Sequence, residues 1–320
     1  MNRHQRRAAE KLGTAPANQI SHALSSDAER TLKFDPKGVY EIDAANIRAS
    51  SLLNPYDMTL QFRSGMRFEI GRFSQSVLSR CRVIASSQED VPLRIGAFCE
   101  AAFQSVIMVG GDHRNDSIWN YTCAGNSRPF YDLMEREDQL LTQVRKARSI
   151  TIGDNVVIST SATILGGSEI GTGSVIGANT LVNKVCEDYG IYVGTPARRA
   201  KDRFAPERAK LHQIANIPNI HSHHVPRLPR LLRDLEFGVI SPEEYRTSVS
   251  FIEKRPRLFI EARTKDGTPE LQRITGYALG DTPITDPEAV DYLNTYFAQV
   301  WAPGEKVMWT PDIFHTLGLC

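Results

Sequence analysis

The sequence has no hydrophobic run that approaches the about 20 residues needed for a membrane-spanning helix. It also has almost no net charge, +1 over 320 residues, so we expect no binding to nucleic acid or to an acidic membrane surface. The basic start, Met1 to Arg7, is not followed by a hydrophobic segment, so a secretory signal is not expected either. The remaining class is an ordinary globular chain, with 41% hydrophobic and 23% charged residues.

Cysteine pairs are missing as well. The five cysteines are odd in number, scattered and without a CxxC spacing: Cys81, Cys99, Cys123, Cys186 and Cys320. A disulfide framework and a zinc cluster are therefore not expected, and a cytoplasmic location suits such thiols. No glycine-rich phosphate loop of the P-loop or dinucleotide type is present.

A repeat of six residues organises the middle of the chain. An aliphatic side chain recurs at every sixth position, at Ile152, Ile158, Ile164, Ile170, Ile176 and Val182. Four positions after each comes a mostly small residue: Val156, Ala162, Ser168, Ser174, Thr180 and Cys186. A period of six fits neither an α-helix nor a simple strand, but it suits a triangular prism in which each hexapeptide forms one flat side. One coil cannot bury its own interior, so the coils must stack.

The repeat has an earlier part and one long interruption. Ile70-Gly71 and Ile95-Gly96 begin earlier turns, and residues 82–94 resemble a small insertion between them. From 114 to 149 the phase is lost, in a polar and aromatic excursion that ends in a helix-like stretch over 133–148. A loop of that length inside a compact domain is usually functional.

We therefore predict a mainly β fold in four parts: an N-terminal extension (1–58), a parallel β-helix (59–204) with its excursion loop (114–149), a linker (205–225) and a small α+β appendage (226–320). In the appendage, Ser241-Pro242 predicts the start of a capped helix and Asp286-Pro287 the start of a second one. Residues 257–263 and 271–278 are predicted strands.

The phase, the excursion and the phrase Gly110-Gly111-Asp112-His113 together resemble the hexapeptide-repeat acetyltransferases, in particular their xenobiotic and sugar O-acetyltransferase branch. The end of the repeat, residues 192–198, resembles the closing turn of that family. The resemblance covers about residues 60–204. It implies a left-handed sense of the β-helix, a homotrimer with active sites between subunits, and acetyl-CoA lying along the coils.

The same resemblance implies the site residues. His113, before the excursion, matches the catalytic base. Gly177, Ala178, Gly194 and Thr195 would allow close approach of the pantetheine arm. Arg198 and Arg199, followed by Lys201 and Arg203, would bind the phosphates of CoA or simply form the solvated face of a terminal helix. Asp116, Trp119 and Tyr121 of the excursion are the candidates for binding the acceptor.

Acyl transfer from a thioester needs a base for the acceptor and an acid for the departing thiolate. A single imidazole can do both, because its ordinary pKa near ~6.5 leaves it mostly neutral at pH 7. The alternatives are a surface histidine without a role and a covalent route through Cys123, which would need a close contact between Cys123 and His113. Asp112 and Asp116 would orient the ring or only solvate a turn.

The sequence therefore predicts an acetyl-CoA-dependent O-acetyltransferase acting on a sugar or another small hydroxylated acceptor. An antibiotic acetyltransferase and a catalytically silent trimeric scaffold are the alternatives. No metal is expected: the repeat region contains only His113, and the cluster His221, His223 and His224 is interpreted as part of a polar loop rather than a zinc site. The identity of the acceptor and the preferred acyl chain are not readable from the sequence.

Overall fold

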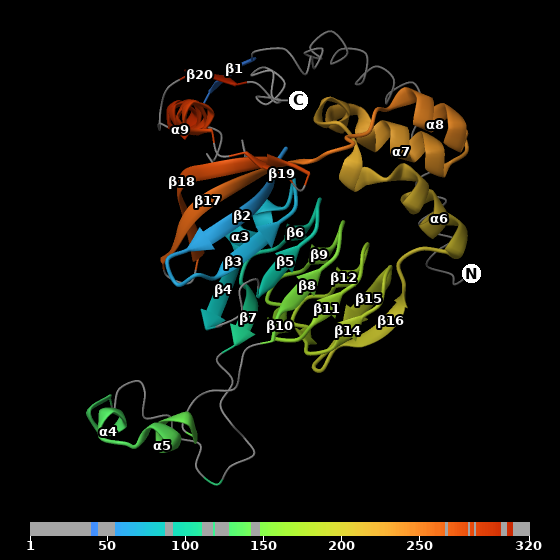
Figure 1. Cartoon of the computed structure of the whole chain (residues 1–320). Coiled ribbons are helices and arrows are strands. Elements are labelled where there is room, and N and C mark those ends of the chain that lie inside the picture. The colour runs from blue at the N-terminus through green and yellow to red at the C-terminus, as the bar shows by residue number, and fades with distance from the viewer. Residues whose placement is uncertain are drawn as a thin grey trace.

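The computed structural model describes residues 40–43, 55–86, 92–110, 118, 128–141, 148–265, 268–280, 282–284, 286–301 and 306–309. A parallel β-helix occupies the middle of the chain (Figure 1). A unit formed by the C-terminal third extends one of its sheets and adds a group of short helices beside it (Figure 1).

Each regular coil of the β-helix places one short strand in each of three parallel sheets. The first sheet receives β3 (Arg67–Ile70), β5 (Leu93–Ile95), β8 (Ile150–Ile152), β11 (Glu169–Ile170) and β14 (Val185–Cys186). The second receives β6 (Glu100–Ala101), β9 (Val157–Ile158), β12 (Val175–Ile176) and β15 (Gly190–Val193). The third receives β4 (Cys81–Ser86), β7 (Ser105–Gly110), β10 (Thr163–Leu165) and β13 (Leu181–Val182). The predicted parallel β-helix is thereby confirmed.

The first coil departs from this scheme. Helix α3 (Gln75–Arg80) stands between β3 and β4, at the place where later coils have a strand of the second sheet. Residues 82–86, expected as part of the insertion 82–94, belong to β4, which pairs with β7 in register, Val83 opposite Ile107. The expectation failed because a helix of six residues replaces one hexapeptide side and hides the phase of the strand after it.

The predicted columns form the core. Every aliphatic residue of the six-residue repeat is at most 2% exposed: Ile152, Ile158, Ile164, Ile170, Ile176 and Val182. The small-residue column is buried with them, and its two serine hydroxyls donate to backbone carbonyls: Ser168 Oγ to Leu165 O at 2.6 Å and Ser174 Oγ to Glu187 O at 2.9 Å. Stacking in register therefore gives each coil its dry interior. The burial of apolar surface stabilises the fold by about 25 cal/mol for each Å² removed from water.

The excursion leaves the β-helix after Gly110 at the end of β7 and returns at Ile150 in β8. Its described part contains helices α4 (Arg128–Asp132) and α5 (Arg136–Leu141), which project away from the coils (Figure 1). The helix-like stretch predicted over 133–148 is thus shorter in its described part, where α5 spans six residues.

Residues 205–225 were expected to form a linker, and this was wrong. They contain α6 (Pro206–Ala215), the 3-10 helix η3 (Ile217–Asn219) and most of the 3-10 helix η4 (Ser222–Arg227). Together with α7 (Leu228–Glu236) and α8 (Pro242–Ser248) they enclose a hydrophobic cluster of their own, centred on Ile220 and Tyr245. The prolines that suggested a linker occupy first turns of helices, where the missing N–H costs nothing.

The C-terminal strands continue the first sheet. Strand β2 (Asp57–Phe62) pairs antiparallel with β3 and parallel with β17 (Pro256–Lys265), which is followed by β18 (Thr268–Leu279) and β19 (Thr282–Ile284). The hydrophobic core runs unbroken from the coils to Leu258 and Ile260 of β17. This sheet therefore covers the open end of the β-helix, whose first coil would otherwise expose its interior.

The predicted helices of this part are present. Helix α8 begins with the full capping box of Ser241 and Glu244, and α9 (Pro287–Trp301) packs on β18 through Asn294, which bonds to the backbone of Ile274. Strand β1 (Tyr40–Asp43) pairs with β20 (Lys306–Trp309). In the described part of the chain, we find no helix with the length and apolarity that crossing a membrane requires.

A substitution tests the register of the core. Ile164 is 0% exposed and lies between Ile107 and Val182 of the neighbouring coils. Ile164→Asp should prevent folding at ordinary temperature, because a carboxylate without a partner in this interior costs several kcal/mol. Glu169→Ala, at an exposed position of β11, is the control and should change the thermal midpoint little. Equal midpoints for the two variants in circular dichroism melts would show that the register is misassigned.

Candidate functional site

The predicted catalytic and acceptor-binding residues His113, Asp116, Trp119 and Tyr121 lie outside the described residues, as does Cys123. The structure describes where their segment is attached. Gly110 ends β7 on the third sheet with φ 94°, a backbone conformation that favours glycine, and His113 follows three residues later in the sequence.

The four predicted contacts of the pantetheine arm are brought together. Gly177 follows β12, and its N–H donates to Tyr192 O of β15 at 2.8 Å. Thr195 Oγ1 donates to Asn179 O at 3.3 Å, and Gly194 O accepts from the N–H of Leu181 at 3.1 Å. The segments 177–179 and 194–195 therefore lie side by side at one corner of the last two coils, which we call the donor corner.

Two glycines have a reason to stand at the donor corner. A Cβ on Gly177 would come within 2.9 Å of Val193 Cγ1, and Gly194 has φ 93°. A side chain at position 177 would be too close to Val193, and a side chain at position 194 would strain the backbone. Ala178 and Thr195 are exposed beside them. The donor corner thus presents accessible backbone on one small surface.

The two predicted phosphate-binding arginines differ in what they contact. Both lie on β16 (Arg198–Asp202), an antiparallel strand on β15, so the alternative of a terminal helix was wrong. Arg198 is exposed, and among the residues that the structure describes its Nη1 donates to the neighbouring Ala197 O alone, at 3.0 Å. Arg199 is bound to Asp202 at 2.7 Å and to Glu187 at 3.2 Å, and its bonds to Asp202 raise its pKa further. Arg198 is therefore the arginine that remains available for an anion.

Arg203, the last residue of the same basic run, faces inward. Its Nη1 donates to Gly173 O at 2.7 Å and to Asn155 O at 3.2 Å, and its guanidinium packs over the ring of Phe204. Its pKa is lowered by burial. These contacts fix the start of the helical segment against the coils rather than leaving a charge for a ligand.

The histidine cluster contains a structural histidine. His224 is 5% exposed; its Nδ1 accepts from Arg227 Nη2 at 2.9 Å, and its Nε2 lies 2.9 Å from Ser250 Oγ. Burial, and then the charges of His223 and Arg227, lower the pKa of His224 to about 4. Within the described ranges, no three of the His, Cys, Asp and Glu side chains are grouped to hold a metal ion.

The described cysteines are buried thiols. Burial raises the pKa of Cys81 and of Cys99 to about 12 and that of Cys186 to about 11. Thiols of this kind stay protonated near neutral pH and are poor nucleophiles. Their role is to fill the core.

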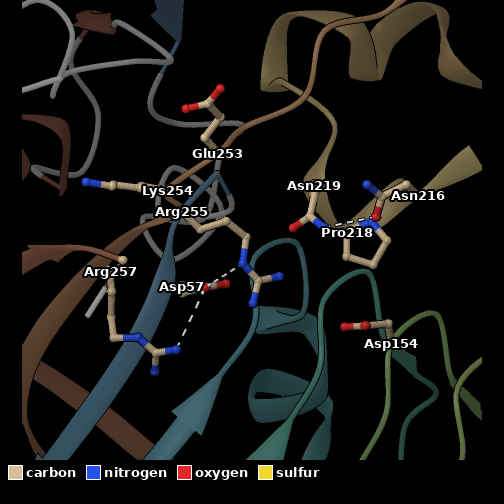
Figure 2. A pocket seen from close by; sticks show the side chains of 10 residues that line it. Asp57, Asp154, Asn216, Pro218, Asn219, Glu253, Lys254, Arg255 and Arg257 are labelled. Carbon is tan, nitrogen blue, oxygen red and sulfur yellow. Dashed lines mark hydrogen bonds and ion pairs between the residues drawn. The ribbon is translucent and has the colours of Figure 1, made fainter. Parts of the chain in front are cut away.

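The structure contains one concave site that we did not predict from the sequence. A cavity of about 380 Å³ lies between the β-helix and the C-terminal unit, with Asp57, Asp154 and Arg255 in its wall (Figure 2). These residues come from segments far apart in the chain and form no local motif.

Comparisons with known proteins agree with the geometry. Residues 149–184 match the family model of the bacterial transferase hexapeptide (six repeats). A chloramphenicol acetyltransferase of Klebsiella aerogenes is 36% identical over 133 residues, which are 41% of this chain and 61% of that enzyme. A probable macrolide acetyltransferase of Lysinibacillus sphaericus is 37% identical over 120 residues, 36% of this chain and 63% of that protein. The matches thus span less than two thirds of these relatives.

Among solved structures, the polySia-specific acetyltransferase NeuO is similar at 20% identity, over 43% of this chain and 48% of that one, with a TM-score of 0.31. This likeness is partial, and nothing about activity follows from it. Residues 149–184 of the chain are thus similar to the hexapeptide repeats of bacterial transferases. The resemblance predicted from the sequence, to the hexapeptide-repeat acetyltransferases, is confirmed.

The buried His224 predicts a dependence of stability on pH. Its pKa in the folded chain, about 4, lies below the ordinary value of 6.5. Between these two pH values the imidazole is therefore protonated in the unfolded chain and neutral in the folded chain. The contribution to the free energy of unfolding is complete above pH 6.5 and is lost as the pH falls from 6.5 towards 4. Urea titrations at pH 7, 5.5 and 4.5 should show this loss, and His224→Gln should flatten it. The same slope in both proteins would mean that another group is responsible.

Proposed function

We propose that this protein is an acetyl-CoA-dependent O-acetyltransferase whose acceptor is a sugar or another small hydroxylated molecule. The observation that supports this most directly is the donor corner. Residues separated in the sequence, Gly177–Ala178 and Gly194–Thr195, form one accessible strip of backbone at the end of a β-helix. Acetyltransferases are the relatives that share 36–37% identity with this chain.

Acetyl-CoA is the proposed acetyl donor, and the chain holds it in two ways. Its pantetheine arm lies along the donor corner, where Gly177 and Gly194 allow close approach of the backbone. Its phosphates contact Arg198, whose guanidinium is exposed on β16 and carries no ion pair within the described residues. A guanidinium suits this role because it forms paired, charge-assisted bonds with phosphate oxygens.

His113 is the proposed general base. The neutral imidazole accepts the proton of the acceptor hydroxyl as its oxygen attacks the thioester carbonyl, and returns a proton to the departing thiolate. Its segment begins at Gly110, at the end of a coil strand, which anchors it to the same rigid β-helix as the donor corner. Asp116, Trp119 and Tyr121 are proposed to bind the acceptor.

The proposed active unit is a homotrimer, with each active site between two subunits. Phe103 supports this assembly: it is 59% exposed although apolar, and its carbonyl accepts from Ser161 N–H in the corner column that continues to Asn179. Val193, beside the donor corner, is 43% exposed. Apolar side chains exposed along one corner suit contact with a neighbouring subunit.

A second candidate is an antibiotic acetyltransferase, which the chloramphenicol and macrolide acetyltransferase relatives favour. The two candidates share the donor corner and His113 and differ only in the acceptor. A thiol-release assay with chloramphenicol, a macrolide and a panel of sugars therefore separates them. A silent scaffold differs from both, because calorimetry would detect no acetyl-CoA binding.

The base is tested by His113→Ala and His113→Asn. Both variants should keep the assembly and acetyl-CoA binding, while turnover falls by about 10² to 10⁴, the usual contribution of a positioned acid–base group. Turnover of the unsubstituted protein should rise with pH through the range where an imidazole loses its proton. The measurement is thiol release between pH 5.5 and 9. Retention of more than half of the turnover in both variants would exclude His113 as the base.

The donor corner is tested by the contrast between two arginines. Arg198→Ala should weaken acetyl-CoA binding by roughly tenfold or more, as expected when a charged hydrogen bond is lost, without lowering the thermal midpoint. Arg208→Ala removes the same charge from α6, where Arg208 contacts Glu236, and should leave the affinity unchanged. Isothermal titration calorimetry with CoA measures both. Equal affinities in the two variants would place the phosphates elsewhere.

A further inference from the structure

The cavity beside the β-helix is formed by segments that meet only in the folded chain (Figure 2). Asp154 comes from the turn after β8, Asn216 and Asn219 from the end of α6 and from η3, and Arg255 from the segment before β17. Its volume of about 380 Å³ lies within the range of small-molecule sites. A smaller cavity of about 240 Å³ shares Asp154 and Arg255 and continues towards Gly96.

One wall of the cavity is positively charged. Asp57 is 3% exposed; its Oδ1 accepts from the N–H of Arg72 at 2.9 Å, and its Oδ2 lies 3.1 Å from Arg255 Nε and 3.9 Å from Arg257 Nη2. A single carboxylate thus faces two guanidinium groups. Figure 2 shows that the terminal nitrogens of Arg255 point away from this pairing into the open space, whereas the amine of Lys254, another lining residue, points to the opposite side.

The opposite wall carries a carboxylate. Asp154 Oδ1 accepts from the N–H of Ala97 at 2.6 Å, while Oδ2 has no donor among the residues that the structure describes. Burial raises the pKa of Asp154, and the positive charge of Arg255 works against this rise. Figure 2 shows Asp154 across the space from Arg255, and no ion pair within 4.0 Å joins these two described residues.

Neutral polar groups lie between the two charges. Asn219 Nδ2 donates to Asn216 Oδ1 at 2.9 Å. This leaves the side-chain atoms Asn219 Oδ1 and Asn216 Nδ2 for other partners. Figure 2 shows both side chains above the gap between Arg255 and Asp154. The cavity therefore offers free donors at one end, a free acceptor at the other, and both kinds between them.

This arrangement selects a ligand by its charges. An anion alone would pair with Arg255 but would be repelled by the carboxylates. A cation alone would pair with Asp154 but would be repelled by the arginines. An uncharged ligand would displace water from both charges without giving either a counter-ion, which is costly in a partly buried site. A molecule with one charge of each sign complements both walls at once.

We propose that the cavity binds a small zwitterion of the free amino acid class. Its carboxylate contacts Arg255, and its ammonium group contacts Asp154. Because the walls belong to both the β-helix and the C-terminal unit, the ligand bridges the two and stabilises their contact. The site is separate from the donor corner, and the proposal is independent of the proposed acetyl transfer.

The experiment uses the full chain and calorimetric titration with each of the twenty standard amino acids. At least one should bind with a Kd of about 1 mM or tighter and should raise the thermal midpoint. For that amino acid, the N-acetyl form, which lacks the ammonium group, and the amide, which lacks the carboxylate, should each bind at least about tenfold more weakly. The absence of binding by every amino acid up to about 10 mM would overturn the proposal, as would equal binding of the blocked forms or of acetate alone.

Two variants locate the site. Asp154→Asn keeps an oxygen for the N–H of Ala97 but loses the charge, and should weaken binding at least about tenfold. Lys254→Met removes a positive charge from the Arg255 side of the lining, so it should also weaken binding, and its exposed position carries little risk to folding. The control is Glu253→Gln, an exposed residue of the rim whose carboxylate points away from Arg255 in Figure 2, and it should bind as the unsubstituted chain does. Unchanged affinity in both Asp154→Asn and Lys254→Met would show that the amino acid binds elsewhere.

Discussion

A coil of three flat sides has no interior of its own, and the rest of this structure depends on that constraint. Each buried aliphatic residue contacts its equivalents in the coils before and after; Ile164, for instance, lies between Ile107 and Val182. The apolar column is dry only because the coils stack in register. Stacking in turn aligns the corners, so that residues 177–179 and 194–195 meet in one place. The donor corner is therefore a by-product of the packing that makes the fold stable.

The same constraint leaves the two ends of the stack to be covered, and here charge is used as well as apolar contact. At the first coil, the buried Asp57 joins Arg72 of the β-helix to Arg255 before β17. Arg72 is itself fully buried and donates to Ile220 O at 2.7 Å in the helical segment. Removing one partner of such a buried set usually costs more than its net contribution, because the remaining charge is left without compensation. The C-terminal unit is thus fixed to the coils through a few polar contacts at the edge of a continuous hydrophobic core.

The sequence predicted those parts of the molecule that repeat or that carry local signals. The columns from Ile152 to Cys186 and the capped helix at Ser241 needed only periodicity and cap chemistry, and both are confirmed. Helix α3 and the helices of 206–227 were missed, because six residues are too few for a helical period and because prolines at helix starts resemble linker punctuation. The cavity could not be predicted at all, since its charged walls come from segments that only tertiary contacts bring together. The assignments of His113 and of the acceptor residues remain predictions from the sequence resemblance.

The pairing of β2 with β17 also bears on the order in which the chain folds. Contacts between regular coils join near neighbours: Asp154 bonds to Thr172, 18 residues along the chain. The side chains of Arg257 and Thr59 in the covering sheet are hydrogen-bonded although they are 198 residues apart. Loop closure disfavours the distant pairing until the intervening segment is already compact. During synthesis the coils therefore form early, while the first sheet keeps an edge that is open to other chains until β17 has emerged.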